Sequence, residues 1–450
     1  MIPVLTPEEM AAVDAAAPEP VEVLIERAGA AVARGVLDLL GGAYGRRVVV
    51  VAGKGNNGND GRAAATRLRR RGVRVAVLDA ADVPARLPPC DLVVDAAYGT
   101  GFRGTWAPPD PGDALVLAVD IPSGLDGRTG EAGGPVLAAE RTVTFAALKP
   151  GLVLGQGPEL AGEVHLADIG LDVRGATTAL VEDADVAGWL PARPRDAHKW
   201  QAAVWVVAGS PGMTGAATLA ARGAQRIGAG YVRLSTPGGD VGHGGPVEAV
   251  GTPLPADGWA AEVLEGVERF AAVVVGPGLG RDDATGAEVR RLVARCPVPV
   301  VVDGDGLAAL GDDPGAVVPR SAVLTPHDGE FARLTGGPPG PDRVAAAAGL
   351  ARSAGCFVLL KGSTTAVAAP DAGVFLVMAG DARLATAGTG DVLSGAIGGL
   401  LASGLDPGRA AAAGAHLHGR AARLGPSRGL VAGDLPDLLP AAVASVAARG

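Results

Sequence analysis

The segment Ala387-Gly388-Thr389-Gly390-Asp391-Val392-Leu393-Ser394-Gly395 joins a glycine-rich turn to an apolar run that extends to Leu401. The run predicts a helix that begins at Asp391. Free N–H groups in the first turn of a helix and the positive end of its dipole favour a bound phosphate, and Gly388 and Gly390 allow the backbone to approach it closely. The sequence therefore predicts an anion site at the start of this helix.

Asp391 is the candidate catalytic residue of this segment. A carboxylate among such donors could take a proton from a substrate hydroxyl while the amides hold the phosphoryl group that moves onto it. The alternative is that Asp391 only caps the helix, as aspartate often does. The segment alone leaves both interpretations open, because glycine-rich turns before helices are common.

The composition predicts a folded chain with more than one domain. A length of 450 residues is typical of two or three domains. Aromatic residues make up only 3%, so the core must consist of valine, leucine and alanine, and 70 glycines and 35 prolines predict many tight loops. A hydrophobic share of 48% argues against disorder.

Charge and cysteine content limit the class of partner. A net charge of −9 argues against a general nucleic-acid or anionic-membrane surface, so phosphate binding would have to be local. Cys90, Cys296 and Cys356 are far apart without metal-ligand spacing, which fits reduced thiols in a cytosol. No signal peptide opens the chain and no apolar stretch spans a bilayer. We therefore expect a cytoplasmic protein that binds neither nucleic acid nor membrane.

Lysine and asparagine are rare and lie near glycine-rich loops or other candidate residues. The 39 basic residues include only four lysines, Lys54, Lys149, Lys199 and Lys361. The only asparagines are Asn56, Asn57 and Asn59. Lysine is a compact charge that arginine cannot replace geometrically, and the asparagine amide both donates and accepts. We interpret these residues as candidates for chemistry.

Strands alternate with helices in the first half of the chain. Helices are expected over Pro7–Leu40, with an interruption near Pro18 and Pro20, and over Arg62–Arg71. The expected strands are Arg47–Ala52, Val73–Leu78, Leu92–Ala96, Leu115–Val119, Thr142–Ala146 and Val164–Leu166. This alternation predicts a Rossmann-like, doubly wound α/β sheet.

Three polar loops follow strands of this sheet. Gly53–Gly61 matches the pattern G-x-G-x-x-G, and Asp79 lies near the spacing of a ribose-binding acid, so a dehydrogenase dinucleotide domain is a rival interpretation. Two features count against this rival. The loop Gly53–Gly61 is more polar than a dinucleotide fingerprint needs, and two further loops, Tyr98–Gly104 and Asp120–Gly124, follow other strands. Because the carboxyl ends of parallel strands share one sheet edge, the three loops predict one pocket. Its side-chain oxygens, notably those of Asn57, Asp95 and Ser123, could ring a hard cation.

Together, Gly53–Gly61, Val94–Gly101 and Val119–Asp126 resemble the NAD(P)H-hydrate epimerase domain, over about the first 170 residues. The resemblance implies that the asparagine-rich loop binds the hydrated nucleotide and that Asp120 is a catalytic residue lying against the substrate. It also implies that the three oxygen ligands hold K⁺. The implied substrate-binding residues are Asn56, Asn57, Gly58, Asn59, Asp60, Gly99, Thr100, Gly101, Phe102, Arg103, Gly104, Thr105 and Asp120.

The chain loses strand periodicity from Leu171 to Asp196, which predicts a boundary near Gly175 and domains 1–175 and 176–450. Beyond it, polar loops again follow expected strands. These loops are Gly209–Ala217, Gly276–Gly280, Asp303–Gly306, Leu324–Glu330 and Lys361–Thr365. Each alone fits an ordinary turn, but five of them together with Ala387–Ser394 favour a site at one sheet edge. No Walker A pattern is present, so phosphate would be held by this other arrangement.

The markers His198-Lys199, Ala208–Ala217, Gly276–Gly280, Leu324–Leu334 and Ala387–Gly395 resemble the ribokinase-like fold. Within that fold they resemble ADP-dependent NAD(P)H-hydrate dehydratase rather than a sugar kinase. The resemblance implies that four residues contact the hydrate: Ala216, Gly278, His327 and Asp391. It implies that the adenine nucleotide contacts Lys361, Gly362, Ser363, Thr364, Thr365 and Gly390.

Both resemblances imply repair of hydrated NADH and NADPH. The first domain would interconvert the R and S hydrates, and the second would use ADP to phosphorylate and dehydrate the S hydrate, giving NAD(P)H, AMP and phosphate. Asp391 would deprotonate the ring hydroxyl, Lys361 and the helix amides would steady the transferred group, and Mg²⁺ would screen the charge. The alternative is a ribokinase-like small-alcohol kinase with a non-catalytic, nucleotide-sensing N-terminal module. Expected partners are these small molecules and further copies of the chain, as in a homotetramer.

Overall fold

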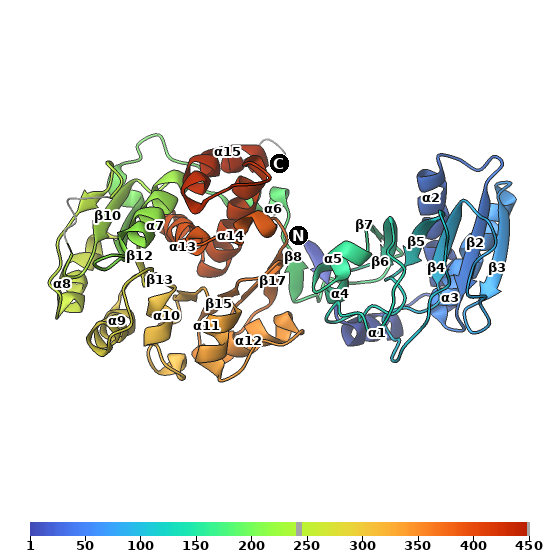
Figure 1. The fold of residues 1–450 in the computed structure, drawn as a ribbon, viewed down its shortest axis with the longest axis horizontal. Coiled ribbons are helices and arrows are strands. Elements are labelled where there is room, and N and C mark those ends of the chain that lie inside the picture. Colours follow the sequence, from blue (N-terminus) through green and yellow to red (C-terminus); the bar gives the residue numbers. More distant parts are fainter. Residues whose placement is uncertain (240–244, 448–450) are drawn as a thin grey trace. The chain divides into compact units, whose positions relative to one another are not determined.

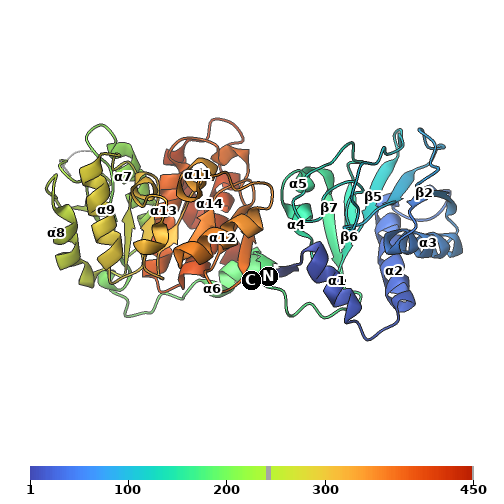
Figure 2. The same cartoon turned by 90° about the horizontal axis from the view of Figure 1, so that it is seen from below.

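The chain folds into two compact units, drawn in Figures 1 and 2. The structure, a computed structural model, describes residues 1–239 and 245–447. One unit comprises Ile2–Thr178, and the other begins at Ala179. Among the described residues, none of the helices is both long and apolar enough to cross a membrane.

A parallel sheet with the order β3-β2-β4-β5-β6-β7 forms the centre of the first unit. Its strands are β2 (Arg47–Ala52), β3 (Arg74–Asp79), β4 (Leu92–Ala96), β5 (Leu115–Val119), β6 (Arg141–Phe145) and β7 (Glu163–Ala167). The chain runs from β2 to β3 in one direction and continues from β4 to β7 in the other. The order therefore reverses beside β2, and ligands of such sheets bind at this point, beyond the carboxyl ends of the strands.

Buried valines explain why the centre of this sheet forms. Val48–Val51 are buried on both faces of β2, as expected for an interior parallel strand. Helices α2 and α3 pack on one face, whereas Leu87, Leu137 and Ala139 from connecting segments cover the other. The remaining elements of this unit are β1 (Ile2–Val4), α1 (Pro7–Ala15), α2 (Val21–Leu40), α3 (Asn56–Arg70), α4 (Pro150–Val153) and α5 (Gly157–Leu160).

The start of α3 differs from the sequence prediction. The helix was expected from Arg62, but it begins at Asn56 directly after its N-cap, Gly55. The asparagines therefore form the first helical turn rather than a loop. Polar residues are tolerated there because the first N–H groups of a helix have no partner within it. This start brings both Asn56 and Asn57 to the sheet edge.

The second unit is built on a larger sheet. Its strands follow the order β8-β17-β16-β15-β14-β13-β12-β9-β10-β11, parallel from β15 to β11 and antiparallel where β16 joins β15 and β17. The strands are β8 (Thr178–Leu180), β9 (Ala203–Val207), β10 (Tyr231–Ser235), β11 (Val250–Gly251), β12 (Ala272–Val275), β13 (Val300–Val302), β14 (Val323–Leu324), β15 (Phe357–Leu360), β16 (Thr365–Ala368) and β17 (Val374–Val377).

Helices cover both faces of this sheet. Figures 1 and 2 show α7, α13, α14 and α15 on one face and α9 to α12 on the other. The helices are α6 (Asp183–Trp189), α7 (Thr214–Ile227), α8 (Trp259–Gly266), α9 (Asp283–Arg295), α10 (Asp305–Ala309), α11 (Asp328–Thr335), α12 (Arg343–Ala354), α13 (Thr389–Ala402), α14 (Pro407–Leu424) and α15 (Leu435–Ala447). Strand β8 and helix α6 lie in the segment that the sequence left without periodicity, because both are short.

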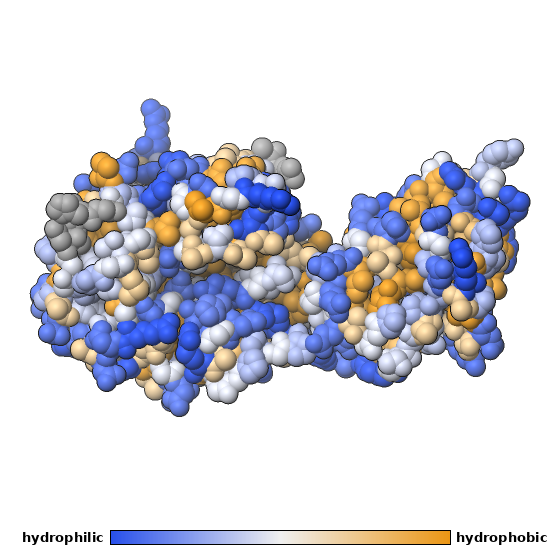
Figure 3. All heavy atoms as spheres, in the orientation of Figure 1, coloured by the Kyte–Doolittle hydropathy of each residue, from blue (hydrophilic) through white to orange (hydrophobic). Residues whose placement is uncertain are grey.

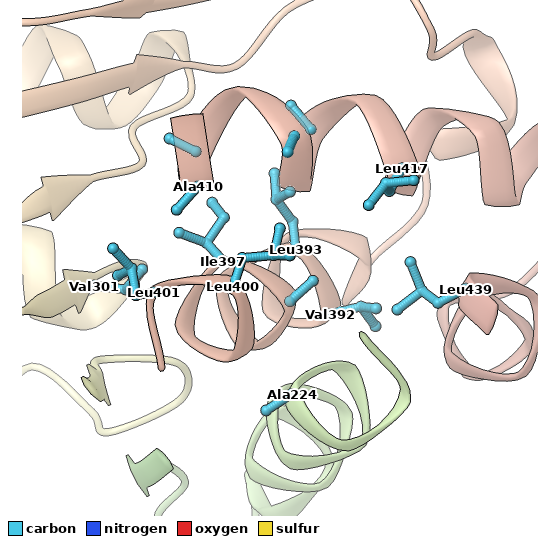
Figure 4. Close-up of a cluster of buried hydrophobic side chains, with 14 of the residues drawn as sticks. Ala224, Val301, Val392, Leu393, Ile397, Leu400, Leu401, Ala410, Leu417 and Leu439 are labelled. Atoms are coloured by element: carbon cyan, nitrogen blue, oxygen red, sulfur yellow. The ribbon is translucent and has the colours of Figure 1, made fainter. Parts of the chain in front are cut away.

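Helix α13 is the most enclosed helix around the core of this unit. All its residues from Val392 to Ala402 are buried, and Figure 4 shows Ile397 and Leu400 among side chains of neighbouring helices. The core consists mainly of valine, leucine and alanine. Outside, Figure 3 shows hydrophilic residues over much of the face drawn, with apolar residues in smaller groups.

The first turn of α13 corrects one interpretation of Asp391. The helix begins at Thr389, two residues earlier than expected, and its N-cap is Gly388 with φ 90°. Asp391 therefore lies inside the first turn and does not cap the helix. Among the described residues, no side chain forms a capping hydrogen bond at this end, so its amides stay available to a ligand.

Candidate functional site

A pocket of about 800 Å³ lies in the first unit, where strand ends meet α1 and α2. Residues that follow β2, β4, β5 and β6 line this pocket together, so the three polar loops form one pocket as predicted. The predicted residues that line it are Asn56, Asn57, Asp60, Gly99, Thr100, Gly101, Phe102, Arg103 and Asp120. Gly58, Asn59, Gly104 and Thr105 are not among the lining residues. A Cβ on Gly58 would lie 1.9 Å from the carbonyl oxygen of Gly53, which makes Gly58 necessary for the turn.

Asp120 and Lys149 form a buried ion pair in this pocket. The Nζ of Lys149 lies 2.5 Å from Oδ1 of Asp120 and donates to Thr144 Oγ1 at 2.8 Å. Two backbone carbonyls, of Phe145 and Ala147, accept its other contacts at 3.2 and 3.3 Å. Asp120 has φ 68°, a strained conformation for a residue with a side chain. The pocket therefore holds one carboxylate in a fixed direction.

Two further carboxyl groups line the same pocket. Burial, followed by the negative charge of Asp120, raises the pKa of Asp60 to about 8. Partial burial also raises the pKa of Asp14, although the charge of Lys149 opposes the rise. The pocket thus combines a salt-bridged carboxylate with a carboxyl group that is protonated at neutral pH.

The three predicted cation ligands lie close to one another. Asp95 is fully buried, and its carboxylate accepts from the N–H and the Oγ of Ser123 at 2.9 and 2.6 Å. Ser123 Oγ also accepts from the N–H of Tyr98 at 2.8 Å. The neighbour of Tyr98 is Gly99, and a Cβ there would lie 3.6 Å from Oδ1 of Asn57. Ser123 and Asp95 are therefore joined by hydrogen bonds, and Asn57 lies against the adjoining Tyr98–Gly99 backbone.

This cluster fits a cation. Both polar atoms of the Asn57 amide are buried and have no hydrogen-bond partner among the described residues. Burial raises the pKa of Asp95, although hydrogen bonds from Ser123 and from the N–H of Ala97 oppose the rise. A bound cation would satisfy the amide oxygen and the carboxylate together.

Asp79 does not take part in the pocket. Its Oδ1 accepts from the N–H of Ala81 at 2.9 Å, and the side chain is exposed at the end of β3. The rival interpretation as a dehydrogenase domain required an acid there to bind a ribose, whereas Asp79 only stabilises its own turn.

The second unit brings Lys361 and several carboxylates together at the predicted sheet edge. Lys361 Nζ lies 2.9 Å from Oδ1 of Asp303 and 3.5 Å from Oε2 of Glu330. Although burial opposes it, these two negative charges hold the pKa of Lys361 above its usual value. A Cβ on Gly390 would lie only 3.5 Å from the same Nζ, so the ammonium lies against the first turn of α13.

Asp391 follows Gly390 in this first turn and is partly buried. Burial raises the pKa of Asp391 to about 7, and the negative charge of Asp303 adds to the effect. The positive charge of Lys361 opposes the rise. A carboxyl group with a pKa near neutrality beside free helix amides has the properties of a general base.

The three other predicted hydrate contacts are Ala216 in α7, Gly278 after β12 and His327 at the start of α11. Gly278 has φ 63°, and a Cβ there would lie 2.9 Å from Cβ of Ala216, so these two residues touch. His327 is the N-cap of α11, where its Nδ1 accepts from the N–H of Gly329 at 3.0 Å. The exposed Nε2 of His327 lies 3.5 Å from Glu330.

The predicted nucleotide-binding segment Lys361–Thr365 joins β15 to β16. Arg343 donates to the carbonyl of Lys361 at 2.6 Å and pairs with Asp328 at 2.9 Å. Gly362 and Ser363 are exposed, whereas Thr364 is buried. The segment therefore presents a backbone turn to solvent beside the Lys361 ammonium.

The two histidines of α14 have separate surroundings. His416 Nε2 lies 2.8 Å from Oδ1 of Asp183. His418 lies against the backbone of Thr389, and burial lowers its pKa to about 4. Within the described ranges, the structure has no group of three or more His, Cys, Asp or Glu side chains suited to a metal ion.

Sequence reasoning singled out the loop of Asp303 but not its carboxylate, and it did not name Glu330 or Asp14 as site residues. Asp303 follows a buried strand as Asp120 does, and Asp95 lies at the end of another strand, so the same rule would have found Asp303. Asp14 carries no such signal, because α1 reaches the pocket only through tertiary packing. Lys149 was marked by the rarity of lysine but not placed in the site.

Models of two protein families match this chain. The family described as NAD(P)H-hydrate dehydratase matches residues 204–443. The family described as YjeF-related protein N-terminus matches residues 21–86 and 78–151. The two matches fall in the second and the first unit, respectively.

Solved structures resemble the second unit. An ADP/ATP-dependent NAD(P)H-hydrate dehydratase from Bacillus subtilis, co-crystallised with ATP and Mg²⁺, is 31% identical. Its TM-score is 0.53, and the match covers 59% of this chain and 97% of that chain. A ribokinase-like superfamily protein from Enterococcus faecalis, 23% identical with a TM-score of 0.54, matches over 60% of this chain and 97% of that chain and shows the fold alone. The predicted Rossmann-like and ribokinase-like α/β folds are confirmed.

Curated relatives extend over both units. A bifunctional NAD(P)H-hydrate repair enzyme of Moorella thermoacetica is 39% identical over 93% of this chain and 91% of its own length. The enzyme of the same description from Mycobacterium tuberculosis is 43% identical over 83% and 82%, respectively. The Escherichia coli enzyme of that description is 34% identical over 87% of this chain and 84% of its own length. The chain belongs to the family of bifunctional NAD(P)H-hydrate repair enzymes.

Proposed function

We propose that the two activities of this family are divided between domains 1–175 and 176–450. The chain repairs hydrated NAD(P)H by epimerising the R and S hydrates and by ADP-dependent dehydration of the S hydrate. The first domain carries the epimerase pocket and the second the dehydratase site. The observation that carries the dehydratase assignment is the partly buried Asp391 within the uncapped first turn of α13, beside Lys361.

In the dehydratase domain, Asp391 accepts the proton of the ring hydroxyl as that oxygen attacks the β-phosphorus of ADP. The transfer releases AMP, and the phosphorylated oxygen then leaves as phosphate while the ring loses a proton and becomes NAD(P)H. Lys361 and the first-turn amides of α13 stabilise the moving phosphoryl group. Phosphorylation matters because phosphate leaves far more readily than hydroxide.

The adenine nucleotide contacts a lysine, a turn and a helix amide in this proposal. Its binding residues are Lys361, Gly362, Ser363, Thr364, Thr365 and Gly390. The hydrate contacts Ala216, Gly278, His327 and Asp391. Mg²⁺ supplies charge screening when it is bound with the nucleotide. Phosphate oxygens of the nucleotide would serve as ligands to Mg²⁺, as is usual for this ion in phosphoryl-transfer sites.

In the epimerase domain, K⁺ is held by Asn57, Asp95 and Ser123. The support for this assignment is the buried Asn57 amide without a partner among the described residues and the fully buried carboxylate of Asp95 beside Ser123. Asp120 is the catalytic carboxylate, oriented by Lys149 at 2.5 Å. The hydrate fills the pocket that Asn56, Asp60 and the Gly99–Arg103 segment surround.

The expected partners are hydrated NADH, hydrated NADPH and ADP. We propose that the protein acts in the cytoplasm as a homo-oligomer, such as a tetramer. Sedimentation at micromolar concentration measures the oligomeric state directly, and a single monomeric species would refute this part.

The substitution Asp391→Asn tests the dehydratase assignment. Asparagine has nearly the same shape but cannot accept the proton, so the dehydration rate should fall roughly 10²–10⁴-fold. The assay follows recovery of reduced-nicotinamide absorbance from the S hydrate with ADP. Calorimetry should still show ADP binding, and epimerisation in the same sample should continue at its usual rate.

Asp371→Asn is the matched control, because Asp371 is an exposed carboxylate that pairs with Arg320. It should keep full dehydration activity. An Asp391→Asn variant that folds normally and retains near-full dehydration would remove Asp391 from the mechanism.

A further inference from the structure

Asp303 follows β13, a central strand of the second unit, and is almost completely buried with 2% exposure. Its two carboxylate oxygens have different partners. Oδ1 lies 2.9 Å from Nζ of Lys361, and Oδ2 lies 2.5 Å from Oγ of Ser394. One buried carboxylate therefore connects the end of β15 to the first turns of α13.

Ser394 extends this connection to the helix backbone. Its Oγ also lies 2.9 Å from the carbonyl oxygen of Gly390. A Cβ on Gly390 would lie 3.8 Å from Oδ2 of Asp303, so the first turn of α13 packs directly over the carboxylate. Any shift of Asp303 would move both Lys361 and the turn that carries Asp391.

The charges around Asp391 come from several elements. The groups that act on it are Asp303 after β13, Lys361 after β15, Asp305 of α10 and Glu330 of α11. Asp303 is the strongest of these charges and favours the protonated form of Asp391. A base works best when its pKa is near the operating pH, because a more acidic carboxylate takes a proton less readily.

We propose that Asp303 is a positioning residue of the dehydration reaction. It fixes the Lys361 ammonium and the first turn of α13, and its charge keeps Asp391 a strong base. This inference rests on the proposed role of Asp391 as the base. It also predicts an effect on the pH dependence of the reaction: the negative charge of Asp303 raises the pH at which Asp391 ionises and can accept a proton.

Asp303→Asn tests the charge, since asparagine keeps the size and an acceptor for Ser394. The measurement is the pH profile of kcat for ADP-dependent dehydration. Without the negative charge, Asp391 ionises more easily, so the acidic limb should move down by about one pH unit. The maximal kcat should fall about tenfold, because Asp391 is then a weaker base. An acidic limb at the wild-type pH would overturn the inference.

Asp303→Glu and Asp371→Asn are the matched controls. Glutamate restores the charge in a displaced position, so the acidic limb should return towards that of the wild type even where kcat stays low. Asp371→Asn should leave the whole profile unchanged. A glutamate variant whose limb matches that of Asp303→Asn would contradict the role of the charge.

Ser394→Ala provides a test that changes no charge. It removes the hydrogen bond between α13 and Asp303, so kcat should fall about tenfold, the loss expected for a bond to a charged group, while the acidic limb stays in place. Wild-type kcat in this variant would refute the positioning role, even if Asp303→Asn does not fold.

The Asp391→Asn variant, measured alongside, separates the two proposals: if it stays active, the proposed base is wrong. If it is inactive and the Asp303 profile does not move, only the positioning role is wrong.

Discussion

Two of the four lysines hold a carboxylate at the centre of a site. Lys149 pairs with Asp120 at 2.5 Å and Lys361 with Asp303 at 2.9 Å. In both places the ammonium is too enclosed for a guanidinium of larger size and fixed planar shape. This accounts for lysine in a chain whose other basic residues, apart from Lys54 and Lys199, are all arginine.

Lys361→Met should weaken ADP binding, because the variant removes the ammonium but keeps a side chain of similar length. A charge-assisted bond to phosphate contributes roughly 1.5–3 kcal/mol, which corresponds to about a 10- to 100-fold loss of affinity. Titration calorimetry with ADP measures it. The exposed Lys199 offers the control Lys199→Met, which should bind ADP as the wild type does. Equal affinity in both variants would assign Lys361 a purely structural role.

Asp60 should make the first unit less stable as the pH rises. Its pKa is about 8 in the folded chain and near 3.8 when unfolded. Between these values the folded state holds a proton that the unfolded state has lost, so stability falls as pH increases through this window. In Asp60→Asn this pH dependence should shrink, seen as a smaller decrease in Tm between pH 5.5 and pH 8. An Asp79→Asn control should keep the full wild-type decrease.

At the scale of elements, the crossing of α7 and α13 depends on glycine. A Cβ on Gly395 would lie 1.9 Å from the carbonyl oxygen of Ala220, and one on Gly223 would lie 2.3 Å from that of Val392. The two helix backbones are therefore in direct contact on both sides of the crossing. This contact helps to fix where the first turn of α13 lies over the sheet.

Gly395→Ala should destabilise the second unit by roughly 1–3 kcal/mol, because the added methyl group forces the helices apart. Gly349→Ala is the matched control, since Gly349 lies in α12 with no atom within 4 Å of the added Cβ. Alanine there should be neutral or stabilising by up to about 1 kcal/mol, through better helix propensity. Urea unfolding measures both. Equal effects of the two substitutions would show that α7 and α13 tolerate separation.

The elements of this fold differ in how well the sequence predicts them. Most strands are short valine-rich runs, and the six predicted in the first unit deviate from their predicted bounds by one residue at most, whereas β1 was not predicted. The starts of α3 and α13 were predicted too late, because glycine, threonine and asparagine have low helix propensity in peptides. In the folded chain both helices begin at these residues, directly after a glycine N-cap.

The site residues also differ in how well the sequence predicts them. Asp95 and Asp120 could be predicted because strand ends of a parallel sheet converge. The ion pair of Lys361 with Asp303 could not be, since it joins residues 58 positions apart whose strands have β14 between them. The local sequence pattern identifies which residues lie at the carboxyl edge of the sheet, and only the tertiary structure shows which of them contact one another.

At the scale of the whole molecule, the two proposed sites lie in separate units, so the two activities should be lost separately. Asp95→Ala should abolish epimerisation, because it removes the only full negative charge of the proposed K⁺ site, and it should leave dehydration of the S hydrate intact. Asp391→Asn should show the opposite loss. Starting from pure R hydrate with ADP, an equimolar mixture of the two variants should recover NADH, whereas each variant alone should be slow.

This mixing experiment depends on free diffusion of the S hydrate between molecules. The initial rate of NADH formation above the spontaneous rate is the measurement, with each variant alone at the same total concentration as the control. A mixture no faster than the better single variant would contradict the separation of activities.

The position of the lysines also determines how the protein responds to acylating reagents. Lys149 is buried, Lys361 is largely enclosed, and the exposed lysines are Lys54, which lines the epimerase pocket, and Lys199. A mild amine-reactive label should therefore modify Lys54 and Lys199 first and reach the two enclosed amines slowly. Because a ligand in the pocket covers only Lys54, the ratio of label on Lys54 to label on Lys199 would act as an internal gauge of pocket occupancy.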